Sequence, residues 1–165
     1  METTKPNNPT PRDVETLMTD YVMPALNAKL KETDPDAPGL TYYYNDISRQ
    51  EQTGDANGIG ATYPCLFRLL RTDTEYRAGT YTDRFVFKET FVFGEKAHTD
   101  PGPGTEPPME NRLLKRIAAF NAVMASVPGV TYTPPTTLKW WRRDTADYAL
   151  LVSFDARIEL NTPTC

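Results

Sequence analysis

Apolar residues recur at spacings of three and four over residues 14–30, which is the pattern of one face of an amphipathic helix. Thr10 and Pro11 are typical of a helix N-terminus, so we expect Thr10 at the N-cap and Pro11 at the first helical position. Pro24 lies inside the apolar stripe and lacks a backbone donor, and we therefore expect a kink there. The polar, Pro-rich run over residues 34–39 should end the helix.

Alternation of apolar and polar residues predicts strands in the first half of the chain. It is clearest over residues 85–93, where four phenylalanines fall on one face. Shorter strands are expected over residues 40–44 and 63–70. Residues 71–81 are polar and rich in turn formers, and we interpret them as a connection.

The last third of the chain predicts a helix followed by a hairpin. A second apolar stripe indicates a helix over residues 109–127, which the Pro-Gly pair after it should end. Strands over residues 138–143 and 147–160 should pair across a short turn. In the last strand, alternation places Ala149 and Leu151 on the outward face, followed by polar residues.

Strands with one polar face are typical of a sheet that is covered on one side only. We therefore predict the α+β class: a mainly antiparallel sheet with two amphipathic helices packed on one face, and long loops. The domain should span residues 11–160. Residues 1–10 are expected to form a flexible arm, and residues 161–165 a short C-terminal tail.

Composition narrows the class of protein. The chain has 165 residues and a mass of 18.6 kDa, which suits one domain. Its formal net charge of −4 excludes a polycation built to bind nucleic acid. We find no apolar run long enough for a transmembrane helix and no secretory-signal pattern, and we expect no membrane association. Cys65 and Cys165 form no CxxC pair.

Residues that could carry catalysis or bind a metal are few and scattered. His98 is the one histidine, and it lies in a Pro/Gly-rich loop without a surrounding motif. Cys65 lies in an apolar strand, where a small core residue is expected. The run over residues 55–60 is similar to the start of a calcium loop, but Ile59 holds a ligand position. We therefore predict a protein that is not an enzyme, with no cofactor and no metal site.

The most unusual segment is Lys139–Arg143, in which two tryptophans lie between basic residues. Such a segment can pack at the edge of a core, anchor a protein–protein interface or contact nucleic acid, and the sequence leaves all three uses open. Adjacent residues of a strand point to opposite faces, so one tryptophan can enter the core while the other faces outward.

The element order suggests a family. The apolar stripe over residues 14–30, the strand over 63–70, the helix over 113–127 and the final strand over 148–160 together resemble the tail terminator and head–tail joining (neck) proteins of long-tailed bacteriophages. The resemblance is one of size, element order and lack of catalytic residues. It implies a small α+β subunit that forms a ring, typically a hexamer, at the tail terminator or neck position. There the ring caps the tail tube and joins it to the head.

The resemblance also implies partners and a location. The subunit would contact copies of itself, tail-tube proteins and head-connector proteins, and DNA would pass through the ring without specific binding. It would be assembled in the host cytoplasm and belong to the virion. A ring needs two different patches on each subunit. We expect long polar loops to supply one patch and exposed Trp or Tyr the other. The predicted interface residues are Arg49, Asp55, Trp141, Arg142, Arg143, Arg157 and Glu159. The alternative is an intracellular protein-binding module that uses a Trp/Tyr-rich face.

Overall fold

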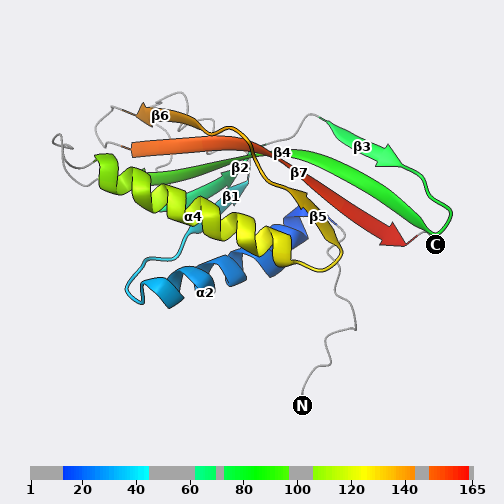
Figure 1. Ribbon diagram of the computed structural model, residues 1–165, viewed down its shortest axis with the longest axis horizontal. Coiled ribbons are helices and arrows are strands. Elements are labelled where there is room, and N and C mark those ends of the chain that lie inside the picture. Colours follow the sequence, from blue (N-terminus) through cyan, green and yellow to red (C-terminus); the bar gives the residue numbers. More distant parts are fainter. Residues whose placement is uncertain (1–12, 45–61, 70–72, 97–105, 144–148, 164–165) are drawn as a thin grey trace, which may run out of the picture.

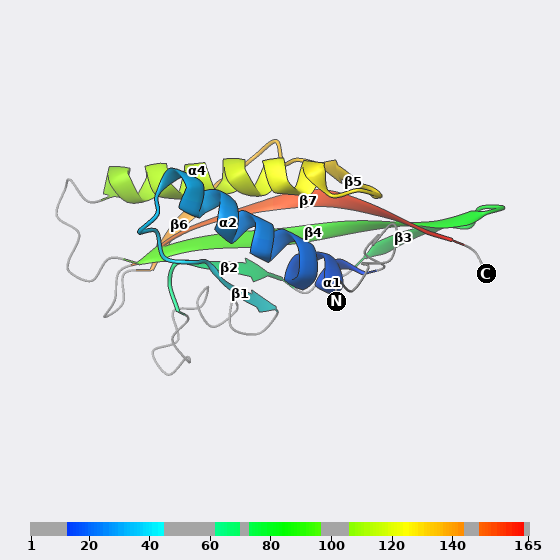
Figure 2. The same ribbon diagram turned by 90° about the horizontal axis from the view of Figure 1, so that it is seen from below.

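The computed structural model describes residues 13–44, 62–69, 73–96, 106–143 and 149–163. It confirms the predicted α+β class, because a seven-stranded, mainly antiparallel sheet carries two helical stretches on one face (Figures 1 and 2). The expected N-terminal arm lies outside the described residues. So do residues 45–61 and 97–105, which make up most of the long loops that we expect between the strands and before the second helix.

The first helical stretch is continuous but changes from α-helix to π-helix and back. It consists of α1 (Val14–Thr16), the π-helical η1 (Leu17–Val22) and α2 (Met23–Thr33). The N-cap expected at Thr10 is wrong, because Asp13 caps the helix: its Oδ1 accepts a hydrogen bond of 2.6 Å from the backbone N–H of Thr16.

At Pro24, where we expected a kink, the structure has a change of helix type. Pro24 stands at the start of α2, directly after the π-helical turns. The N–H of Met23 bonds to the carbonyl of Met18, five residues back. The π-helical turns therefore end next to Pro24, which has no N–H to donate. Proline and π-helical turns are both known causes of helix bending.

The second helix, α4 (Glu106–Ser126), begins three residues earlier than predicted. The helix therefore includes residues 106–108, which the apolar stripe left outside it. Pro107 and Pro108 lie in the first turn, where backbone N–H groups have no acceptor within the helix and proline is tolerated.

Two long strands form the centre of the sheet. β4 (Thr82–Lys96) and β7 (Ala149–Pro163) pair antiparallel over their whole lengths. The free edge of β4 carries β2 (Cys65–Arg68) near one end and β3 (Thr74–Arg77) near the other. β3 falls in the segment that the sequence indicated as a connection, and its four residues become a strand by pairing with β4.

The free edge of β7 is shared in the same way. β6 (Lys139–Arg143) pairs with its first residues, which confirms the predicted hairpin, and β5 (Val130–Thr133), which was not predicted, pairs further along. β1 (Thr41–Tyr44) lies outside β2 and is parallel to it. β7 continues three residues past its predicted end, so residues 161–163 belong to the sheet rather than to a tail.

The main core lies between the helices and one face of the sheet. The helical stripes bury their apolar side chains against the phenylalanines of β4. Phe120 of α4 occupies the centre, with its ring centroid 5.0 Å from that of Phe91 and 5.6 Å from that of Phe93, both in edge-on geometry. Edge-on pairs add stabilisation beyond the burial of area.

The opposite face of the sheet is not polar throughout, which corrects the prediction. Ala149 and Leu151, expected to point outward, are fully buried with Cys65, Phe67 and Val92 in a second apolar cluster. Alternation along β7 predicts on which face of the sheet each side chain lies, but not whether other elements cover that face. Further along β7 the same face is polar, as predicted, with Asp155 and Arg157 exposed and Ser153 and Glu159 partly buried.

Candidate functional site

β6 carries the predicted Trp-Trp pair along one end of β7. Its register sets Trp140 opposite Val152 and Trp141 opposite Leu151, so the two indoles lie on opposite faces of the sheet. Trp140 is 36% exposed. Trp141 is half-buried against the second apolar cluster, and its indole N–H is buried without a hydrogen-bond partner among the described residues.

Two arginines follow the tryptophans. Arg142 is exposed and stands opposite Leu150. Arg143 is the last residue of β6, and its side chain lies outside the described part of the structure, as do Arg49 and Asp55. We define the β6 patch as Trp140, Trp141 and Arg142.

Arg157 and Glu159 lie further along β7, on the polar part of the face opposite the helices. Nη2 of Arg157 is 3.3 Å from Oε2 of Glu75 on β3, and Glu159 forms an ion pair with Arg84 of β4. Arg77, and to a lesser degree Arg157, hold the pKa of the Glu75 carboxyl below its ordinary value. Glu159 therefore pairs with the neighbouring strand β4, whereas Arg157 reaches across β4 to Glu75 on β3.

The same end of the sheet extends past the helices. Figures 1 and 2 show β3 and the ends of β4 and β7 continuing as a narrow ribbon that neither helix covers. Tyr76 and Tyr81 are 56% and 83% exposed on this ribbon. Exposed tyrosines are typical anchors of protein interfaces. We define the ribbon patch as Tyr76, Tyr81, Arg157 and Glu159. It includes both faces of the uncovered ribbon, because Tyr76 lies beside Phe85 on the helix side and Arg157 and Glu159 lie on the opposite side.

The predicted interface residues are therefore not one surface. Trp141 stands opposite Leu151, and Arg157 follows six residues later along β7. At about 3.3 Å per residue, the two positions are roughly 20 Å apart. The structure thus divides the predicted residues between a β6 patch and a ribbon patch, at opposite ends of the sheet.

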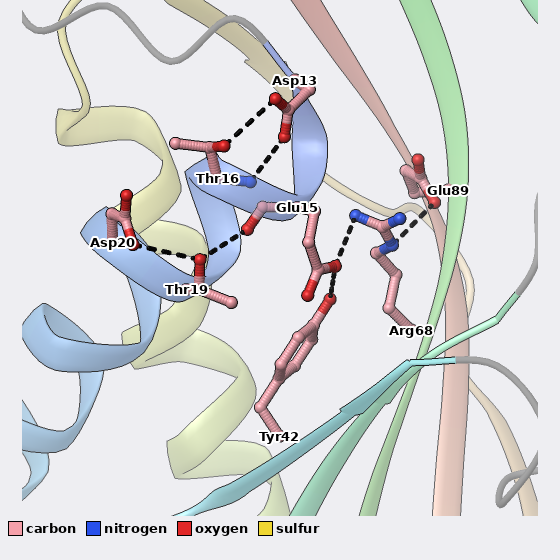
Figure 3. A network of polar contacts seen from close by, with 8 residues as sticks. All are labelled: Asp13, Glu15, Thr16, Thr19, Asp20, Tyr42, Arg68 and Glu89. Carbon is pink, nitrogen blue, oxygen red and sulfur yellow. Dashed lines mark hydrogen bonds and ion pairs between the residues drawn. The ribbon is translucent and has the colours of Figure 1, made fainter.

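A buried polar network joins the start of the first helix to the middle of the sheet (Figure 3). The side chains of Arg68 and Glu89 are 2% and 0% exposed, and Nε of Arg68 lies 3.8 Å from Oε2 of Glu89. Nη1 of Arg68 is 3.4 Å from Oε2 of Glu15 on α1. Tyr42 donates a 2.8 Å hydrogen bond to the same oxygen, and burial raises the pKa of its phenol.

This network was not predicted from the sequence, although one signal was present. Glu89 lies two positions from Phe87 and two from Phe91, so strand alternation places its side chain on the same apolar face. A carboxylate there needs a partner, because burying an isolated charge is costly. Arg68, at the end of β2, supplies a partner and also lies 4.1 Å from the ring centroid of Tyr44. The network therefore positions α1 on the sheet.

The described residues contain no group of three or more His, Cys, Asp or Glu that could hold a metal ion. Within the same ranges, no helix is long and apolar enough to cross a membrane. Cys65 is buried, and burial raises the pKa of its thiol, which disfavours the nucleophilic thiolate. His98 and the calcium-like run over residues 55–60 lie outside the described residues.

No protein-family model and no curated protein matches the chain.

Proposed function

We propose that this chain is a non-enzymatic structural subunit of a phage or phage-like tail. It forms a ring, most simply a hexamer, at the tail terminator or neck position of the virion. The ring caps the tail tube and joins it to the head, and its partners are copies of itself, tail-tube proteins and head-connector proteins. DNA passes through the ring without specific binding.

The observation that carries the proposal is the separation of the β6 patch from the ribbon patch. A closed ring is built from heterologous contacts, in which one surface of a subunit binds a different surface of the next. This chain offers two such surfaces at opposite ends of a rigid sheet, one rich in tryptophan and one rich in tyrosine. Its formal net charge of −4 also fits a channel that lets DNA slide through.

Oligomeric state tests the proposal directly. The native mass is measured by light scattering over a wide concentration range, and the same samples are imaged by negative stain. Wild-type protein should form discrete rings at high concentration. A wild-type protein that stays monomeric throughout and forms no ring would contradict the proposal.

Two single variants test the heterologous geometry. Trp140→Ser removes an anchor of the β6 patch, and Tyr81→Ser removes one of the ribbon patch. Each variant alone should be monomeric, whereas an equimolar mixture should form heterodimers that grow no further, because only one intact contact can form between them. Lys31→Ser, at an exposed site on α2, is the control and should form rings. Rings from both patch variants would exclude these patches from the contact.

A second candidate is an intracellular protein-binding module, and one observation favours it. Tyr43, Tyr63 and Trp141 gather, half-buried, around the second apolar cluster. Such a module would stay monomeric and bind its partner through the β6 end alone. Tyr81→Ser should then leave both the monomeric state and partner binding unchanged, which distinguishes the two candidates.

A further inference from the structure

A groove lies on the helical layer, between the end of α2 and the middle of α4. The two helices lie side by side on the same face of the sheet (Figures 1 and 2). The groove has a volume of about 600 Å³ and is lined from both helices and from the turn after α2. It uses none of the residues of the β6 patch or the ribbon patch.

The floor of the groove is apolar and made largely of small side chains. Leu30 is half-buried there, and Ala118 and Ala119 line it from α4. Leu114 is 42% exposed and precedes Ala118 by one helical turn, so the apolar surface continues along α4. Short side chains on a helix surface allow a second helix to approach closely.

The rim of the groove is basic, although the whole chain is acidic, with a formal net charge of −4. Arg112 and Arg116 both contact the single carboxylate of Glu95, with Arg112 Nε 3.2 Å from Oε1. Lys29 and Lys115 line the groove without an ion-pair partner among the described residues. Asp34 is the one acidic residue in the described lining, so the groove keeps a net positive charge.

We propose that this groove is a docking site for an acidic amphipathic helix of another protein. Apolar side chains spaced at i, i+3 or i+4 and i+7 would lie on Leu30, Ala118 and Leu114. Glutamates or aspartates on the flanks would face Lys29 and Lys115. The apolar floor favours this occupant over a phosphate backbone, which would need cations along its whole path. The proposal does not depend on ring formation.

The test uses a displayed library of random 16-residue peptides selected on the full-length chain. The groove variant Lys29→Glu/Lys115→Glu reverses the two unpaired charges. Its matched control, Lys31→Glu/Lys88→Glu, has the same net charge but changes exposed lysines outside the groove lining. All four positions are exposed, so both variants should keep the wild-type circular dichroism spectrum.

Selected peptides should carry acidic residues beside apolar residues at helical spacing. They should bind wild type and the matched control equally and the groove variant at least about tenfold more weakly, with affinity falling as salt is raised. Amide shifts on binding should map to α2 and α4. Four results would each overturn the proposal. The selection could yield no binder, or binders without acidic enrichment. The groove variant could bind the peptides as tightly as wild type does, or a duplex oligonucleotide could compete as well as a selected peptide.

Discussion

Arg68→Met removes the cation at the centre of the buried polar network. At the observed 3.8 Å, attraction between Arg68 and Glu89 is worth about 4 kcal/mol at an effective dielectric constant near 20. The contact with half-exposed Glu15 adds less than about 1 kcal/mol, because solvent screens it. Removing one partner of a buried pair costs about 3–5 kcal/mol. We therefore expect the free energy of unfolding to fall by about 3–5 kcal/mol.

The assay is urea denaturation at pH 7, followed by far-UV circular dichroism and by tryptophan fluorescence. For a chain of this size the loss corresponds to a Tm lower by about 10 °C. Arg77→Met is the matched control. The side chains of Arg77 and its ion-pair partner Glu75 are 55% and 40% exposed, so the change should lower the free energy of unfolding by less than about 1 kcal/mol. Arg68→Met/Glu89→Met, which removes both charges, should recover most of the stability.

Two results would refute this reasoning. The first is a loss for Arg68→Met no larger than the loss for Arg77→Met, since burial would then add nothing to the pair. The second is a double variant whose loss equals the sum of the two single losses, because residues in one network should be coupled.

Three further outcomes are expected. Phe120→Ala should lower the free energy of unfolding by about 3–5 kcal/mol in urea, because it empties the centre of the aromatic core; a loss below about 1 kcal/mol would contradict this. Gly94→Ala should cost about 1–3 kcal/mol in the same assay, since a Cβ there would lie 2.7 Å from Cε1 of Tyr63 and 2.9 Å from Sγ of Cys65; a neutral result would show that these side chains can move. Burial raises the pKa of the Cys65 thiol, so above about pH 8.5 the unfolded chain loses a proton that the folded chain keeps, and stability should fall by about 1.4 kcal/mol per pH unit. Cys65→Ala should lose this slope in denaturation series from pH 8 to 9.5, and an unchanged slope would assign it to other groups.

Local periodicity was enough to predict the helices and the long strands. The stripe over residues 14–30 places the first helix, and alternation over residues 85–93 places the centre of β4, because each pattern reports which residues share a face. The opposite orientations of Trp140 and Trp141 follow from the same rule. In each case the needed information lies within a few neighbouring residues.

The candidate site was predicted only in part. The β6 patch is visible in the sequence because two adjacent tryptophans between basic residues are unusual. Tyr76 and Tyr81 were missed because β3 is four residues long and becomes a strand only beside β4. The basic groove was missed as well, since its lining comes from two helices that are far apart in the sequence.

The sequence by itself determined the periods of the elements and hence which residues share each face. Only the tertiary structure decided what covers each face. It buries Leu151 in a second apolar cluster and brings Arg68 of β2 to Glu89 of β4. It also leaves the ends of β4 and β7 bare beyond the helices (Figure 2). The physical reason is that the free energy of a side chain depends on its neighbours in space, and many of these lie dozens of residues away along the chain.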